Sequence, residues 1–242
     1  IAFNSVYIKP ATSTTTYYVR AFAVNNIGIT WGANVSFITL TPPTLATVIT
    51  SPATSITIST ATLGGNVTLD GGASVTRRGV VYSTSVISDT NSITGGGRLA
   101  SGTGTGGYTI PVTGLAINTL YHVRAFVVNS VGVYLAPEVT FTTLNIPTLT
   151  TLAPTSITSS SAMSGGNITS DGGSPVIRRG IVWNVFPISD TGTNPISIDA
   201  NGGIGTFNLS VPTPVFRTYY VLAFAVNANG VAYGNLIQFQ SL

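Results

Sequence analysis

The sequence has 242 residues, of which only 6% are charged and 43% are hydrophobic. Charged residues make up about 25% of an ordinary globular protein, so this chain is unusually poor in charge. Gly, Pro, Thr, Ser and Asn interrupt every apolar run, and no run approaches the roughly 18 apolar residues that a membrane span needs. Short apolar runs between such residues are typical of strands and turns, which predicts an all-β fold without helices.

Charge and cysteine content exclude further classes of protein. Nine basic residues stand against six acidic ones, giving a net charge of +3. So few basic residues cannot form the clustered patch that nucleic acid binding needs, and no nucleic acid partner is predicted. Cysteine is absent, so disulfides and thiolate metal sites are excluded.

Residues 1–41 end in a pattern that recurs later in the chain. The segment YYVRAFAVNNIG begins at Tyr17, and a short aromatic-bearing run follows from Ile29 to Phe37. Both predict strands, and Ile1 to Ile8 is a candidate third strand. The same pattern closes each later repeat. We therefore interpret residues 1–41, the first module, as the C-terminal part of an incomplete β-sandwich and the chain as an excerpt of a longer array.

Residues 42–144 are predicted to form a complete β-sandwich, the second module. Asp70-Gly71-Gly72 supplies residues that favour positive φ and predicts a tight turn. Alternating apolar and hydroxyl residues predict a strand before this turn. The segment 87–107, rich in Gly, Ser, Thr and Asn, reads as a long loop or a weak edge strand. Strands are predicted over 55–68, 75–83, 108–112, 119–129 and 133–142.

Residues 145–242 repeat this order and are predicted to form a second complete sandwich, the third module. GGNVT at Gly64 returns as GGNIT at Gly165, 101 residues later. DGG, RRG and SDT return at the same spacing, and the YYVRAFAVN pattern occurs for a third time at Tyr219. Several anchors at one spacing predict tandem β-sandwich modules of about one hundred residues.

The run LAINTLYHVRAFVVNSVG, residues 115–132, resembles the F-strand region of fibronectin type III domains. The resemblance implies tandem Ig-like or fibronectin type III-like antiparallel sandwiches. It also implies a tyrosine corner at Tyr121, in which the hydroxyl bonds upstream backbone, with Tyr17 and Tyr219 as counterparts. The family pattern is carried by Leu115, Tyr121, Val123, Asn129 and Gly132, with Ala125 slightly displaced.

As a whole, the modules are similar to a repeat of large secreted proteins of the Bacteroidota. GGNVT with DGG, then RGVVYS, then a Gly/Ser/Thr loop, then YYVRAFAVN occur in that order over nearly all of the chain. The resemblance implies type IX secretion, display at the cell surface and adhesive or gliding roles, and it implies no catalytic activity. Two departures stand out: residues 135–137 read LAP where YG is usual, and Leu222 replaces the usual Arg.

Titratable residues are too sparse to predict a catalytic or metal site. Asp70 and Asp171 lie in tight turns, where the side chain bonds backbone. Calcium would have to use Asp89 with Asp70, or Asp190 with Asp199, and it is disfavoured because it needs six to eight oxygen ligands. No cofactor is predicted.

The histidine and the arginine pairs are the candidates for interfaces. His122 follows Tyr121 on a strand, so it is predicted to face solvent or an interface, and the sequence offers it no catalytic partner. Arg77-Arg78 and Arg178-Arg179 place one guanidinium on each face of a strand. We favour packing on an aromatic ring or pairing with an Asp, with an interface between modules or subunits as the alternative for Arg77 and Arg178.

The low charge suggests that the chain does not stand alone in water. Sugars on Ser and Thr, the hydroxyl groups themselves, or neighbouring chains could cover its surface. We expect an extracellular or cell-surface structural or adhesive protein that self-associates into a fibre. The alternative is a carbohydrate-binding accessory array on a secreted enzyme, which coplanar exposed aromatics would favour. The tryptophans, Trp31 and Trp183, fall at different strand positions.

Overall fold

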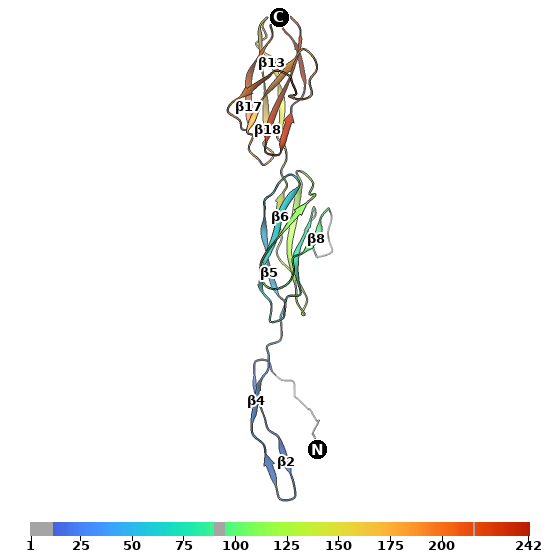
Figure 1. The fold of residues 1–242 in the computed structure, drawn as a ribbon, viewed down its shortest axis with the longest axis vertical. Helices are drawn as coiled ribbons and strands as arrows, with labels where there is room; N and C mark the ends of the chain where they lie inside the picture. The colour runs from blue at the N-terminus through green and yellow to red at the C-terminus, as the bar shows by residue number, and fades with distance from the viewer. Residues whose placement is uncertain (1–11, 90–94, 215) are drawn as a thin grey trace.

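The computed structural model describes residues 12–89, 95–214 and 216–242, and it confirms the all-β prediction. Antiparallel sheets pack in a sandwich-like arrangement, and the described residues contain no helix. Figure 1 shows the three modules following one another end to end along the longest axis. The candidate strand Ile1 to Ile8 lies outside the described residues.

Two sheets face each other in the second module. One has three strands in the order β5-β6-β9, and the other has the order β11-β10-β7-β8, with β12 also paired to β10. The first sheet consists of β5 (Thr47–Thr54), β6 (Thr60–Leu69) and β9 (Gly106–Thr113). The second consists of β7 (Arg77–Ser83), β8 (Gly97–Ala100), β10 (Leu120–Val128), β11 (Val133–Leu135) and β12 (Val139–Thr142).

The third module repeats this arrangement strand for strand. Its three-stranded sheet has the order β13-β14-β17, and its five-stranded sheet the order β16-β15-β18-β19, with β20 also paired to β18. The strands are β13 (Thr148–Thr155), β14 (Ser161–Ser170), β15 (Arg178–Asn184), β16 (Ile196–Asp199), β17 (Gly205–Pro212), β18 (Thr218–Asn227), β19 (Gly230–Tyr233) and β20 (Ile237–Gln240).

Within residues 12–41, the first module has only the counterparts of β10, β11 and β12. Strands β1 (Thr16–Val19) and β4 (Val35–Ile38) pair, as do β2 (Phe22–Val24) and β3 (Ile29–Trp31). These pairs correspond to β10 with β12 and to β10 with β11. The described part of the first module therefore forms a long hairpin-like ribbon without a facing sheet (Figure 1).

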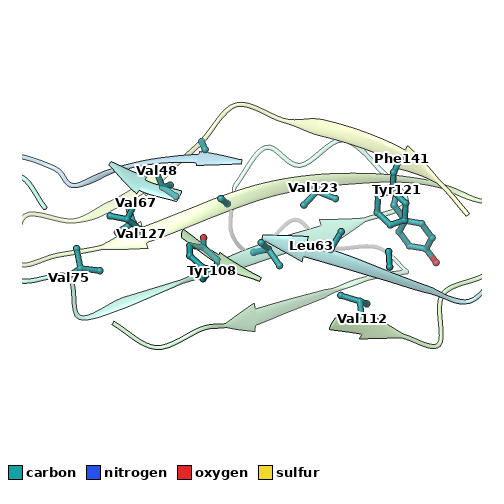
Figure 2. Close-up of a cluster of buried hydrophobic side chains, with 14 of the residues drawn as sticks. Val48, Leu63, Val67, Val75, Tyr108, Val112, Tyr121, Val123, Val127 and Phe141 are labelled. Atoms are coloured by element: carbon teal, nitrogen blue, oxygen red, sulfur yellow. The ribbon is translucent and has the colours of Figure 1, made fainter. Parts of the chain in front are cut away.

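Alternation along the strands builds the core of the second module. Tyr121, Val123, Ala125 and Val127 of β10 are all buried and belong to one cluster with residues of the facing sheet. Figure 2 shows these side chains converging between the two sheets from several strands. Burying apolar side chains of this size stabilises a fold by about 1.5–3 kcal/mol each, so this cluster dominates the stability of the module.

The Gly-Gly pair of the repeated GGN motif makes room for an aromatic ring. A Cβ on Gly65 would lie 2.8 Å from both the Tyr108 hydroxyl and the Ala125 Cβ. The Tyr108 hydroxyl crosses from β9 to the facing sheet and donates to the Gly79 carbonyl at 2.7 Å. In the third module, a Cβ on Gly166 would meet the Phe207 ring at 2.8 Å. Glycine inside these strands thus allows the close approach that the core requires.

The strands of the second module differ from the prediction at four main places. No strand was predicted over β5. The strand predicted over 55–68 begins only at Thr60, because Ser55 adopts a φ of 48° and ends β5. The segment predicted as loop or weak edge contains the short strand β8. The single strand predicted over 133–142 is divided into β11 and β12, which lie one after the other along the same partner, β10.

Candidate functional site

The predicted tyrosine corners are built into the strand that carries the repeated YYVRAFAVN pattern. The Tyr121 hydroxyl accepts a hydrogen bond from the Ala116 backbone N–H at 2.9 Å, and the Tyr17 hydroxyl accepts one from Thr12 at the same distance. Each donor lies five residues upstream of the tyrosine. Tyr219 is buried and stacks on Phe239. Tyr17 and Tyr121 therefore bond upstream backbone, as the corner prediction expects, and Tyr219 is held at the start of β18 by its packing on Phe239.

The DGG turn and the AVN-x-x-G segment meet where the chain enters a module. In the second module, the Asn129 side-chain amide donates to the carbonyls of Thr44 and Asp70. The Thr44 backbone N–H also donates to the Gly71 carbonyl at 2.8 Å. The turn holds its shape because the Asp70 carboxylate accepts from the Gly72 N–H. Two motifs far apart in sequence thus clamp the incoming linker.

The third module clamps its incoming linker in the same way, at Asn145. The Asn227 side-chain amide donates to the carbonyls of Asn145 and Asp171, and the Asn145 N–H donates to the Gly172 carbonyl at 2.7 Å. The preceding residue, Leu144, belongs to the second module: its N–H donates to the Thr57 carbonyl at 2.9 Å. Consecutive residues are thus bonded into different modules, with no unbonded residue between them.

The junction between the first and second modules is longer. Thr39 is bonded into the first module through its N–H to the Thr15 carbonyl, and Thr44 is bonded into the second. The intervening residues 40–43 read LTPP. Pro42 and Pro43 lack a backbone N–H and have a fixed φ, so this linker is restricted by its prolines rather than by hydrogen bonds. The two junctions therefore differ in how they are held.

The arginine pairs pack within their own modules. The Arg77 guanidinium lies 5.7 Å from the centroid of the Phe126 ring, and Arg178 lies 5.5 Å from that of Phe224. Both rings belong to the neighbouring strand, as the packing alternative expects. Both Arg77 and Arg178 are exposed, and the interface role predicted for them stays a prediction.

The second arginine of each pair holds the loop before β9 or β17. The Arg78 guanidinium donates to the carbonyls of residues 101, 104, 105 and 106 and lies 5.0 Å from the centroid of the Tyr108 ring. Arg179 is buried; it bonds the Asp199 carboxylate at 2.7 Å and donates to the carbonyls of Gly203 and Ile204. The sequence predicted that an arginine of each pair could bond an Asp, but it did not identify Asp199 as the partner of Arg179.

His122 has a partner that the sequence did not reveal. Its Nδ1 lies 2.7 Å from a carboxylate oxygen of Glu138, whose other oxygen accepts from the Ile87 N–H. Burial by itself would raise the pKa of Glu138, but hydrogen bonds from His122 and Ile87, with the charges of His122 and Arg124, hold it below its usual value. His122 and Glu138 lie 16 residues apart in sequence. The pairing of β10 with β12 brings them together, so their spacing in sequence did not reveal the pair.

The serine that the strand register places opposite His122 is not accessible. Ser83 lies opposite His122 in the strand register, but it is fully buried, and its Oγ accepts from the Ser85 N–H. A hydroxyl without solvent exposure cannot reach a substrate. Arg124, next to the pair, donates to the carbonyls of Ala136, Ile87 and Leu135. This polar group therefore secures the 84–89 loop against the outer face of the sheet.

Neither cavities nor metal ligands mark a site in the described ranges. Two shallow hollows, of about 530 and 330 Å³, open to solvent on the second module, and the titratable residues that line them are Tyr108 in the first and Asp70 in the second. Within residues 12–89, 95–214 and 216–242, no three His, Cys, Asp or Glu residues gather as metal ligands. The described residues also include no helix long and apolar enough to cross a membrane.

Comparisons with known proteins add little. No family model matches the chain, and no curated protein matches it in sequence. Among solved structures, the chain is similar to the sensor domain of the anti-sigma factor RsgI4 of Pseudobacteroides cellulosolvens. The match has 20% identity and a TM-score of 0.32, and it covers 42% of this chain and 96% of that one. A similarity this low carries no argument about function.

Proposed function

We propose that this chain is part of a non-enzymatic extracellular protein in which tandem Ig-like or fibronectin type III-like modules form the stalk or body of a surface fibre. The junction at Leu144–Asn145 carries the proposal. Each of these adjacent residues is bonded to a different module, so the second and third modules have no flexible linker between them. A spacer that projects from a surface needs such stiff joints, whereas flexible linkers of several residues would let the array coil.

The character of the surface supports the same role. The hollows on the second module are shallow and open to solvent, and the strands carry rows of Thr and Ser. The sequence resembles secreted repeats of the Bacteroidota, and this resemblance supports a location outside the cell. Carbohydrate binding through aromatics is less favoured, because Trp183 packs against the core of the third module.

The first module offers an edge for self-association. In the second module, β7 pairs with β10 over seven residues, but the corresponding side of β1 and β2 has no partner among the described residues. Val19, Phe22 and Val24 are each more than half exposed. A two-stranded ribbon alone is marginally stable and an open apolar edge invites pairing. We propose that a strand with the RRGVV chemistry of β7 completes it, in a fibre or multichain assembly.

A peptide of residues 74–84 tests this pairing. We expect it to protect the amides of residues 18–24 from hydrogen exchange when it is added to the intact chain. The same peptide with Val81→Pro, which removes a backbone donor on the side of the strand that pairs with β10 in the second module, should protect them less. Sedimentation velocity at rising chain concentration then shows where the completing strand comes from. Association of the chain without peptide indicates that a neighbouring chain supplies the strand, and no association indicates that the same polypeptide supplies it. Lack of any protection by the peptide would contradict strand addition.

Electron microscopy of the source cells tests the function itself. Gold-labelled antibodies raised against the 242-residue chain should decorate filaments or stalks on the outer surface of intact cells. Label confined to the cell interior of sectioned cells would overturn the proposal.

A further inference from the structure

Two arginines share one aromatic ring on the outer face of the second module. Phe126 of β10 is fully buried, and the Arg98 guanidinium of β8 lies 4.7 Å from the centroid of its ring. The Arg77 guanidinium of β7 lies 5.7 Å from the same centroid. Attraction between each cation and the ring holds both charges at one place on the sheet. We call Arg77, Arg98 and Phe126 the arginine face.

No carboxylate of the described residues neutralises the arginine face. The two ion pairs in the described part of the chain are His122–Glu138 and Arg179–Asp199, and neither includes Arg77 or Arg98. The Arg98 Nε is buried and has no hydrogen-bond partner. Burial and the charge of Arg77 lower the pKa of the Arg98 guanidinium, in keeping with two neighbouring cations. Two neighbouring cations repel each other, and an anion bound beside both of them relieves this repulsion.

The third module shows that the fold does not need the second arginine. There, Arg178 lies over Phe224 as Arg77 lies over Phe126. The strand register places Arg98 opposite Val81 and Ile196 opposite Val182, and these valines occupy equivalent positions. An isoleucine therefore serves at the position of Arg98 in an otherwise matching sheet. Only 6% of the residues in this chain are charged. Because an isoleucine packs at the equivalent position, packing alone does not explain the charge of Arg98.

We propose that the arginine face binds the carboxylate or sulfate groups of an acidic polysaccharide. Guanidinium groups bind such oxyanions through two parallel hydrogen bonds. The Arg77 side chain is exposed on an open sheet face, which suits an extended polymer better than an enclosed small molecule. Two guanidiniums are too few for nucleic acid, whose affinity comes from many phosphate contacts. If the arginine face is repeated along a fibre, many weak contacts with one polymer would together give a high overall affinity.

Binding of oligogalacturonate to the intact chain tests the proposal, with dextran sulfate as the sulfate probe and neutral dextran as the control. Calorimetry should show binding of at least one acidic polymer that weakens between about 20 and 200 mM NaCl, because exposed charges are screened. Arg98→Ile copies the third module and should weaken binding at least about tenfold, the effect of losing one charge-assisted contact. Arg178→Ala should leave binding unchanged.

A gain-of-function variant separates binding from folding. Ile196→Arg should build a second arginine face beside Phe224 and double the number of binding sites per chain. Unfolding curves of each variant check that the modules stay intact. The proposal is overturned if neither acidic polymer binds, or if Arg98→Ile binds as the parent chain does. Binding of a poly-glutamate peptide without binding of either polysaccharide would also overturn it, in favour of an acidic protein partner.

Discussion

Single buried hydroxyls join the two sheets of each sandwich. In the second module, the Thr50 Oγ1 of β5 accepts from the Ala125 N–H of β10 at 2.9 Å and donates to the Pro137 carbonyl at 2.7 Å. In the third module, the Thr151 Oγ1 accepts from the Ala223 N–H at 3.0 Å. Both threonines are buried. These bonds cross the core rather than follow a sheet, so each hydroxyl sets how the two sheets face each other.

Replacing Thr50 by valine tests this crossing bond. Thr50→Val keeps the shape of the side chain but leaves the buried Ala125 N–H without a partner. We expect the second module to lose about 1–3 kcal/mol of unfolding free energy, measured by hydrogen exchange of the β10 amides. Thr50→Ser keeps the hydroxyl and should lose less. Equal losses in both variants would mean that packing, and not the hydrogen bond, accounts for the effect.

The His122–Glu138 pair predicts a pH dependence of stability in the second module. Because the folded pKa of Glu138 is below its usual value of 4.5, the folded state favours the carboxylate. Its stabilising contribution is complete above the usual pKa and is lost as the pH falls through the lower folded pKa. The free energy that Glu138→Gln costs should therefore be largest above about pH 5 and shrink towards about pH 3. Urea unfolding followed by NMR signals of the second module measures this, and a constant cost across that range would contradict it.

At the scale of elements, Arg78 and Arg179 occupy equivalent strand positions but have different partners. Arg179 forms an ion pair with Asp199, whereas Arg78 donates to backbone carbonyls. Arg179→Leu leaves the Asp199 carboxylate without its cation, and we expect the third module to lose about 3 kcal/mol. Arg78→Leu frees only carbonyls, most of them exposed, so about 1 kcal/mol is expected for the second module. Hydrogen exchange resolves the two modules in one experiment. Arg179→Leu with Asp199→Asn should recover part of the loss, since no charge is left behind, and a double variant as unstable as the single one would refute this account.

Periodicity and repetition predicted the elements well wherever a strand alternates apolar and polar residues. The segment from Tyr121 to Ala125 alternates apolar and polar residues, and β10 covers all of it. No strand was predicted over β5, and the strand predicted over 55–68 began too early because Ser55 gives no sign of its positive φ. Whether the segment that contains β8 is loop or edge strand was not decided, because its sequence is rich in glycine. Pairs such as Arg179–Asp199 could not be predicted, since strand register, not spacing in sequence, brings them together.

For the whole molecule, the junctions decide whether the modules act as a rod or a chain of loose units. The second and third modules meet at Leu144 and Asn145 without an unbonded residue. A Cβ on Gly173 would also lie 2.9 Å from the Leu144 Cδ2, so the side chain of the last residue of one module lies against the turn of the next. At the first junction, residues 40–43 separate the two bonded ends, and the corresponding contact is looser: a Cβ on Gly72 would lie 4.0 Å from the Pro43 Cα. We therefore expect the stiffness of the molecule to differ between its two joints.

An insertion tests this difference. Placing Gly-Ser-Gly-Ser between Leu144 and Asn145 separates the two sets of backbone bonds and should turn the joint into a hinge. The same insertion between Thr41 and Pro42 lengthens a linker that already lacks these bonds, so it should broaden the shape distribution much less. Electron microscopy of single molecules gives the angle between the second and third modules, and small-angle scattering gives the largest dimension. If the chain is a stalk, the angle between the second and third modules should vary little in the parent chain and widely after the first insertion. A parent chain whose angle varies as much as that of the variant would show that the bonds at Leu144 and Asn145 do not stiffen the molecule.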